Sequence, residues 1–335
     1  MKQKTLSIVI PVYNEEKAIL PLLELVDSVK LDVHKEILII NDGSTDKSES
    51  IIKRFVKNHE KKGDRRTTVK YFKKRNGGKG SAVKRGFKES TGDCVIIQDA
   101  DLEYDPNDYE KLIKPILDGK YKVVYGSRRL NKDNKQYSGL LFFLGGNLVT
   151  MMTNLFYGSR ITDEPTCYKV FEGDLIRSMR IEGNKFDWEP EITAKILKKK
   201  IRIKELPIKY FPRTNKEGKK INYIDGIEAI LTLIKWRFKN IDQKEDWNML
   251  DRFIASMRYS RVSKTMVSNK VVMDFGCGEK ATFLKSIVSK IKKGYGIDYK
   301  LQDYAKGKLE LRKMKVGKHI SLADESIDLI TMFAV

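Results

Sequence analysis

The feature that most constrains the fold is an alternation of short apolar runs with helical segments over the first hundred residues. Four apolar, mostly β-branched runs predict buried strands: residues 6–10, 37–40, 69–72 and 94–97. Three segments with apolar residues at helical spacing lie between them: residues 14–29, 48–58 and 81–89. Strands that alternate with helices predict an α/β fold with a mostly parallel sheet, in which ligands bind beyond the carboxyl ends of the strands.

Length and composition set the scale of the protein. The chain has 335 residues, of which 41% are hydrophobic, enough for a buried core and for two domains. The three cysteines, Cys94, Cys167 and Cys277, are far apart and show no metal-ligand spacing, which argues against disulfides or a zinc site. The N-terminus lacks the pattern of a signal peptide, so we expect a cytoplasmic protein.

The net charge is +21, from 66 Lys and Arg against 45 Asp and Glu. This excess favours an anionic partner, such as a nucleotide or a membrane surface, although a lysine-rich solvated surface explains it equally well. No nucleic-acid-binding motif is present, so we do not expect a nucleic-acid partner.

An uncharged segment extends from Gln136 to Ser159 and is long enough to span a membrane. Polar residues such as Asn147, Thr150 and Asn154 interrupt it, and polar groups are costly inside a bilayer. We therefore expect a helix that lies on the membrane surface and gives peripheral attachment on the cytoplasmic face.

Two carboxylates, Asp99 and Asp101, directly follow the strand 94–97. Carboxylates two residues apart at a strand end can share a Mg²⁺ ion that also contacts a phosphate ligand. An acidic turn that caps the next helix is the structural alternative for this short pattern.

Further polar clusters follow the other strands, in residues 11–15, 41–44, 76–82 and 126–129. Carboxylates in the first two could bind a base or a ribose, and the glycine-rich third with Lys79 could face phosphate. Gly126-Ser-Arg-Arg129 offers guanidinium groups for a diphosphate. Each cluster alone is also compatible with ordinary turns, and none has the spacing of a P-loop.

Taken in order, the motifs PVYNE, NDGSTD, NGGKGSA, QDADLE, YGSRR, TDEPTCYKVF, FDWEPEI and PRTNKEGKKI strongly resemble family 2 glycosyltransferases over about residues 5–238. The branch of dolichyl-phosphate mannose synthase and the polyprenyl-phosphate sugar synthases is the most similar. The resemblance implies a GT-A fold, a nucleotide-diphosphate sugar as donor, Mg²⁺ or Mn²⁺ as cofactor, and inversion at the anomeric carbon.

The resemblance also assigns roles to individual residues. It implies that the nucleoside is held by Pro11, Tyr13, Glu15 and Asp42, that Lys79 belongs to the donor loop, that the metal is held by Asp99, Asp101 and Glu103, that Arg128 lies near the donor phosphate, and that Asp163 lies on the acceptor side. The chain departs from the family pattern at Cys167 and Lys169, and Lys135 is the nearest substitute for a basic residue expected before the uncharged helix.

The acceptor implied by the resemblance is a polyprenyl phosphate, whose oxygen is already anionic and needs no strong base. A glycan or other hydroxyl acceptor stays open, and a carboxylate would then have to take the proton. Asp187 and Glu189 are the candidates, although acids at a helix start are also expected near the macrodipole. A non-catalytic sugar-nucleotide-binding module that tethers a methyltransferase is a third reading.

The C-terminal segment, about residues 250–335, resembles class I S-adenosylmethionine-dependent methyltransferases. Asp274, Gly276 and Gly278 match the first motif of that family, and Asp298 matches the acid that binds ribose, which implies a pocket for S-adenosylmethionine in a complete domain. Because the chain stops at Val335, we expect a truncated, Rossmann-like domain. The predicted division is a glycosyltransferase domain (1–240), a linker with a connector helix (241–266) and the methyltransferase-like domain (267–335).

Overall fold

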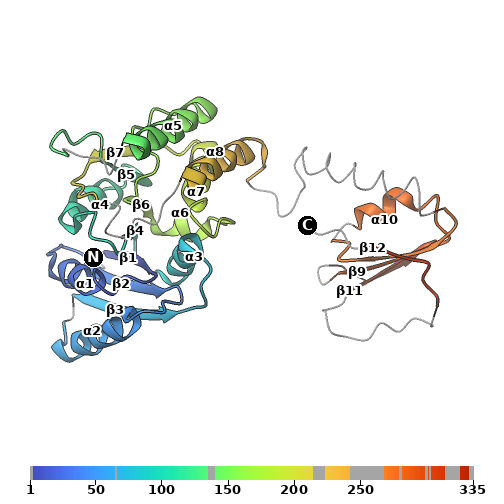
Figure 1. Cartoon of the computed structure of the whole chain (residues 1–335), viewed down its shortest axis with the longest axis horizontal. Helices are drawn as coiled ribbons and strands as arrows, with labels where there is room; N and C mark the ends of the chain where they lie inside the picture. Colours follow the sequence, from blue (N-terminus) through green and yellow to red (C-terminus); the bar gives the residue numbers. More distant parts are fainter. Residues whose placement is uncertain are drawn as a thin grey trace. The chain divides into compact units, whose positions relative to one another are not determined.

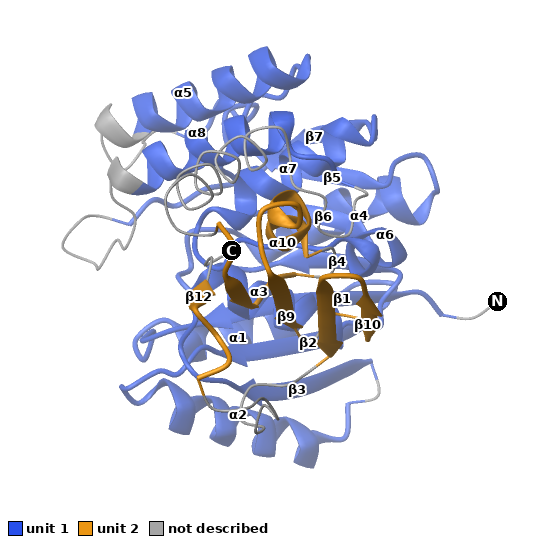
Figure 2. Ribbon diagram, turned by 90° about the vertical axis from the view of Figure 1, so that its right-hand side faces the viewer, with its two compact units in different colours: residues 1–243 blue, residues 244–335 orange. Residues whose placement is uncertain are grey.

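The structure is a computed structural model whose chain forms two compact units, residues 1–243 and 244–335 (Figure 2). It describes residues 3–64, 66–134, 140–213, 223–241, 268–278, 281–298, 301, 303–313 and 325–331, and the side chains of these residues except 140–142 and 223–224. Lys135, which was expected to replace a basic residue before the uncharged helix, lies outside the described residues, as does nearly all of the predicted linker.

A seven-stranded sheet forms the centre of the first unit, in the order β3-β2-β1-β4-β6-β5-β7. Its strands are β1 (Thr5–Val12), β2 (His34–Asn41), β3 (Thr67–Lys73), β4 (Cys94–Ile97), β5 (Val123–Ser127), β6 (Lys169–Glu172) and β7 (Ile203–Pro207). β1 lies in parallel register between β2 and β4, so that Val9 faces Leu38 on one side and Ile97 on the other. These side chains are fully buried, as the continuous apolar runs predict.

The sheet is mostly parallel, and β6 is the exception. It runs antiparallel to both β4 and β5, between which it lies. The sequence does not predict β6 as a strand, because four residues that begin with Lys169 carry too weak an apolar pattern.

Helices cover the sheet of the first unit (Figure 1). They are α1 (Ile19–Ser28), α2 (Ser48–Lys62), α3 (Lys79–Glu89), α4 (Tyr109–Leu117), α5 (Leu140–Tyr157), α6 (Gly173–Ser178), α7 (Trp188–Lys198) and α8 (Tyr223–Phe238), with a short 3-10 turn, η1 (Pro106–Asp108), before α4. α3 packs closely on β1 at Gly86, where a Cβ atom would lie 2.2 Å from Val9 Cγ1.

The first helix begins later than the sequence predicts, at Ile19 instead of Asn14. Asn14 has a positive φ of 52°, and its Oδ1 accepts a hydrogen bond from the Thr45 backbone at 2.8 Å. This side chain ties the loop after β1 to the loop after β2. The polar segment after β1 is therefore kept as loop at the carboxyl edge of the sheet.

Helices α5 and α8 lie side by side (Figures 1 and 2). With α7 they enclose a small second core of Val149, Ala194, Leu233 and Trp236. No helix in the described part of the chain has both the length and the apolar character needed to cross a membrane.

The second unit has its own core and a mixed five-stranded sheet in the order β10-β11-β9-β8-β12. Its elements are β8 (Val271–Phe275), α10 (Thr282–Ile287), β9 (Lys293–Asp298), β10 (Tyr304–Lys306), β11 (Leu309–Lys313) and β12 (Leu329–Thr331). Only the pairing of β10 with β11 is antiparallel.

Candidate active site

A cleft of about 970 Å³ lies at the carboxyl ends of the strands of the first unit. Its walls come from the loops after β1, β2, β4 and β5 and from parts of α3, α5, α7 and α8. The cleft brings together ten of the predicted site residues, which are Pro11, Tyr13, Glu15, Asp42, Lys79, Asp99, Asp101, Glu103, Arg128 and Glu189.

Asp42 organises the glycine-rich loop that leads into α3. Its carboxylate accepts hydrogen bonds from the backbone N–H groups of Gly77 (3.0 Å) and Gly78 (2.8 Å) and pairs with Lys74. Gly78 has φ +92°, and a Cβ there would lie 2.5 Å from the carbonyl oxygen of Asn184. Only glycine fits this turn, which places the start of α3 and Lys79 against the cleft.

Lys79 connects two carboxylates that come from different elements, Asp99 after β4 and Glu189 on α7. Its Nζ lies 2.9 Å from Asp99 Oδ1 and 2.9 Å from Glu189 Oε1. Burial by itself lowers the pKa of this ammonium group, but Asp99 and Glu189 together raise its pKa well above the ordinary value. Lys79 is therefore a fixed positive charge beside Asp99.

Arg213 joins the acidic side chains on the other side of that pair. Its Nη2 lies 3.0 Å from Asp101 Oδ2 and its Nη1 lies 3.3 Å from Glu15 Oε2. Its backbone N–H donates to Glu103 Oε1 at 2.8 Å. This arginine belongs to the PRTNKEGKKI motif, which by itself indicates no role for it, because only the fold brings the segment after β7 to the carboxyl end of β4.

The carboxylate group suits a hard divalent cation. Burial, and then the neighbouring charges of Asp99 and Glu103, raise the pKa of Asp101 to about 7. A carboxyl group held this close to other carboxylates indicates more negative charge than the nearby cations balance. Oxygen donors in such a setting fit Mg²⁺ or Mn²⁺, and Asp99, Asp101 and Glu103 are the residues that would hold it.

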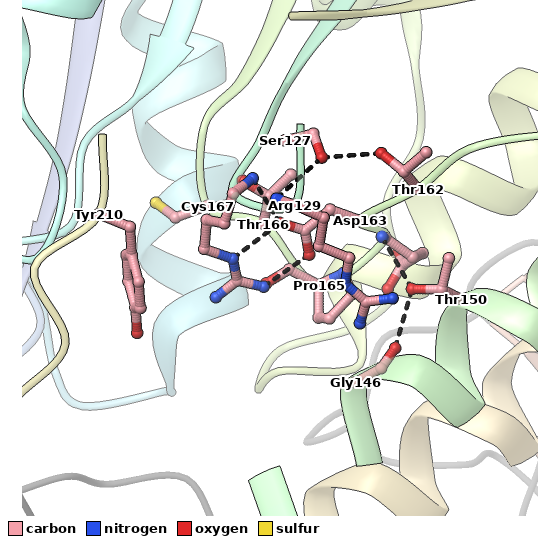
Figure 3. Close-up of polar contacts among 12 residues, drawn as sticks. Ser127, Arg129, Gly146, Thr150, Thr162, Asp163, Pro165, Thr166, Cys167 and Tyr210 are labelled. Carbon is pink, nitrogen blue, oxygen red and sulfur yellow. Dashed lines mark hydrogen bonds and ion pairs between the residues drawn. The ribbon is translucent and has the colours of Figure 1, made fainter. Parts of the chain in front are cut away.

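Arg128 and Asp163 form a buried ion pair. Arg128 donates to Asp163 through Nε (2.8 Å), Nη2 (2.7 Å) and its backbone N–H (2.9 Å). The guanidinium group lies over the ring of Tyr210 at 5.1 Å, and Ser127 bonds to Thr162 next to it (Figure 3). Asp163 is fully buried and is not among the residues that line the cleft.

Arg129 presents a second guanidinium group to the cleft that was not among the predicted site residues. Its Nη1 donates to Asn147 on α5, and its guanidinium group lies 5.6 Å from the Phe143 ring centroid. Its buried Nε has no hydrogen-bond partner among the described residues. The GSRR motif could have pointed to either arginine, and the structure places Arg129 at the boundary between the cleft and the apolar helix α5.

The two candidate bases differ in position. Glu189 lines the cleft, whereas Asp187 is not part of the lining. The carboxylate of Asp187 accepts a hydrogen bond from the Lys185 backbone at 2.8 Å, just before α7. Asp187 directly precedes α7, and its side chain makes no cap hydrogen bond to that helix.

The two departures from the family pattern have buried, structural surroundings. Lys169 donates through Nζ to the carbonyl oxygens of Glu164 and Thr166, both at 2.7 Å, and lies over the Tyr125 ring. The Cys167 thiol is buried, and burial raises its pKa well above the ordinary value. Neither side chain offers a charge to the acceptor side.

A second group of possible metal ligands lies outside this cleft, between α1 and the end of α2. It consists of Asp27, His59 and Asp64. His59 Nε2 lies 3.2 Å from Asp27 Oδ1, while Lys62 Nζ lies 3.8 Å from Asp27 Oδ2, and the buried ammonium group of Lys35 donates to the Asp27 carbonyl oxygen. These cations already supply positive charge, so we assign no ion to this group.

In the second unit, the residues of the expected cofactor pocket gather at the ends of β8 and β9. Gly276 and Gly278 have positive φ angles of 76° and 71°, and Gly278 donates its N–H to Asp298 Oδ2 at 3.0 Å. Asp274 accepts a hydrogen bond from Thr331 at 2.8 Å, and burial raises its pKa to about 6.

The mostly parallel sheet, with one antiparallel strand and an acidic cleft at its carboxyl edge, has the GT-A fold. Solved structures support this. Glucosyl-3-phosphoglycerate synthase from Mycobacterium tuberculosis, solved with Mn²⁺, UDP-glucose and phosphoglyceric acid, superposes with a TM-score of 0.52 over 70% of this chain and 80% of that one. At 19% identity, this similarity shows the fold alone.

Residues 7–173 match the model of glycosyl transferase family 2, and the chain is a glycosyltransferase of this family. An uncharacterized protein of Methanocaldococcus jannaschii is 27% identical over 232 residues, which cover 68% of this chain and 90% of that protein. Undecaprenyl-phosphate 4-deoxy-4-formamido-L-arabinose transferase of Pectobacterium carotovorum is 29% identical over 178 residues, 52% of this chain. The match spans about half (51%) of that relative's length.

The family assignment confirms the predicted enzyme class, a glycosyltransferase. The match ends at residue 173. The resemblance of the second unit to methyltransferases stays a prediction.

Proposed function

We propose that the first unit transfers a sugar, with inversion, from a nucleotide diphosphate to a polyprenyl phosphate at the surface of a membrane. The observation that carries this proposal is the position of the cleft, which runs from the carboxylates Asp99 and Asp101 to the apolar helices α5 and α8. A donor diphosphate and a lipid-linked acceptor need these two ends in one cavity.

The donor end of the cleft has the groups for a nucleoside diphosphate. Pro11 near the end of β1, with Tyr13 and Glu15 after the strand, lines the region proposed for the nucleoside. Asp42 holds the glycine-rich loop beside it. Mg²⁺ or Mn²⁺, held by Asp99, Asp101 and Glu103, would neutralise the charge that develops on the leaving diphosphate. Lys79 supplies a positive charge to the same region.

The acceptor end has the groups for a lipid phosphate. Arg129 and Arg128 both line the cleft, Arg129 beside α5 and Arg128 in its ion pair with Asp163. A phosphate oxygen of the acceptor forms a bond to the anomeric carbon as the bond to the nucleoside diphosphate breaks. That oxygen is already anionic, so the step needs no proton acceptor.

The outer faces of α5 and α8 support docking to a bilayer. Both helices expose large apolar side chains at a spacing of four, three and four residues, which places them on one face of each helix. On α5 these are Leu144, Leu148, Met151 and Leu155, and on α8 they are Ile227, Leu231, Ile234 and Phe238. An apolar surface of this extent beside a basic chain suits a membrane interface.

A hydroxyl acceptor, such as a glycan, is the second candidate, because Glu189 lies in the cleft and could accept a proton. We propose to test both in one experiment, by screening nucleotide-sugars with Mn²⁺ against undecaprenyl phosphate in detergent and against simple glycosides. Product on the phosphate supports the first proposal. Product only on the glycosides, lost in Glu189→Gln, supports the second.

The matched variants for this screen are Asp101→Ala and Asp174→Ala. We expect Asp101→Ala to abolish transfer and weaken donor binding, since the diphosphate would lose its bridging cation. Asp174 is exposed and, among the described residues, forms an ion pair with Arg177 of the same helix, so its replacement controls for the loss of a carboxylate. Full activity of Asp101→Ala in EDTA would contradict the metal-dependent mechanism.

A further inference from the structure

Arg213 lies among the carboxylates of the proposed metal site. It approaches from the segment after β7 and contacts Asp101, Glu15 and Glu103. The side chain is about one-fifth exposed, so its charge is only partly screened by solvent. Its guanidinium group therefore supplies a large part of the positive charge near Asp101.

Charge in this part of the cleft is unbalanced. Among the described residues, Lys79 and Arg213 contact five carboxylates, those of Glu15, Asp99, Asp101, Glu103 and Glu189. Lys79 contacts Asp99 and Glu189, and Arg213 contacts the other three. A guanidinium group and a divalent ion would compete for the same oxygen of Asp101. An oxygen that accepts a hydrogen bond from Arg213 would coordinate a metal ion more weakly.

We propose that Arg213 is an internal counter-cation that exchanges with the divalent ion at Asp101. When Arg213 leaves Asp101, its guanidinium group lies in the same cleft as the donor diphosphate and can bind it bidentately. Exchange then makes metal and nucleotide bind cooperatively, because each favours the displaced position of Arg213. This inference rests on the proposed function and adds a device that sets the metal affinity of that site.

The test measures Mn²⁺ binding to the full chain by the electron paramagnetic resonance signal of free Mn²⁺. Arg213→Gln is compared with wild type and with Lys185→Gln, which removes one exposed positive charge from the lining of the same cleft. Without nucleotide, we expect Arg213→Gln to bind Mn²⁺ about tenfold more tightly than wild type, and Lys185→Gln to change the affinity less than about threefold. Addition of UDP or GDP should tighten Mn²⁺ binding by a smaller factor in Arg213→Gln than in wild type.

Three results would overturn the exchange. Weaker Mn²⁺ binding by Arg213→Gln would show that Arg213 supports the metal site, and equal effects of Arg213→Gln and Lys185→Gln would indicate long-range charge only. Unchanged Mn²⁺ binding by Arg213→Gln, with wild-type transfer still dependent on Mn²⁺, would reject the exchange and leave the proposed function standing. Wild type that binds no Mn²⁺ with either nucleotide would reject both.

A second measurement does not depend on the folding of Arg213→Gln. In ¹⁵N-labelled wild type, we expect the Nε–Hε resonance of Arg213, assigned by its loss in Arg213→Lys, to shift in step with Mg²⁺ binding. A resonance that stays unchanged while Mg²⁺ binds would contradict the exchange.

Discussion

Arg128 and Asp163 were expected in separate roles, and the structure pairs them directly with each other. The two side chains make a bidentate ion pair, and Asp163 is fully buried. Burial alone would raise the pKa of the Asp163 carboxyl, but Arg128 holds this pKa below its ordinary value. The pair fixes the wall of the cleft on which Arg129 lies.

We expect Asp163→Asn to lower the free energy of unfolding by about 3–5 kcal/mol, because it leaves the Arg128 charge buried without its counter-charge. Urea unfolding at neutral pH measures this loss. The double variant Arg128→Met, Asp163→Leu serves as the control and should lose much less, because it removes both charges together. Equal losses in the single and double variants would show that packing, and not charge, is what the pair contributes.

The same pair predicts an effect of acid. Since folding lowers the pKa of Asp163, its stabilisation is present above the unfolded-state pKa of about 3.9 and is lost as the pH falls through the lower folded-state pKa. We expect the wild-type free energy of unfolding to fall more steeply below about pH 4 than that of the double variant. Parallel curves from pH 6 to pH 3 would assign the acid sensitivity to other carboxylates.

At the scale of elements, α5 and α8 are amphipathic in an unusual sense, since each buries one apolar face and exposes another. Val149 and Leu233 pack into the small core that the two helices share with α7, while Leu148, which also lines the cleft, and Leu231 are exposed. The uncharged sequence of α5 predicted a surface helix, but α8 was not expected to extend the same surface. Apolar residues occur on both the buried and the exposed face of α8, so the sequence alone does not show which of them are exposed.

We expect Leu148→Glu with Leu231→Glu to abolish flotation of the protein with anionic liposomes, because two charges would enter the proposed membrane-contacting face. Leu130→Glu is the matched control, since Leu130 is 43% exposed, close to the 44% of Leu148, and lies outside both helices. Wild type should be released by high salt. If the double variant still floats with the liposomes, the exposed apolar faces of α5 and α8 are not the membrane-contacting surface.

At the scale of the whole molecule, each unit has a hydrophobic core of its own. Domains with separate cores can fold separately. We expect residues 1–243 alone to keep the urea midpoint and the donor-dependent activity of the first unit, as measured against the full chain. Loss of both in this fragment would show that the first unit depends on residues 244–335.

We still propose that the second unit is a methyltransferase-like domain with part of a pocket for S-adenosylmethionine. The parallel order β11-β9-β8-β12 and the contact between Gly278 and Asp298 at the ends of two of its strands support a cofactor pocket there. We likewise propose residues 241–266 as the linker between the domains.

The sequence by itself determined the parallel strands β1 to β4 of the sheet and the polar residues that meet at their carboxyl ends. Continuous apolar strands such as Leu6–Ile10 must be buried on both faces, and polar residues at their carboxyl ends, such as Asp42 and Asp99, must then meet at one edge. Local pattern is enough for this, because strand burial and turn chemistry are properties of neighbouring residues.

Only the tertiary structure decided the partners of the charged side chains. Arg213 reaches Asp101 across 112 positions of the chain, and Asp163 reaches Arg128 across 35. The tertiary structure also decided the position of the antiparallel strand β6, which lies between β4 and β5 in the sheet although it follows both in the sequence. Electrostatic pairing depends on distance and burial in space, which a linear motif does not contain, so the sequence named the charged residues and the fold chose which of them meet.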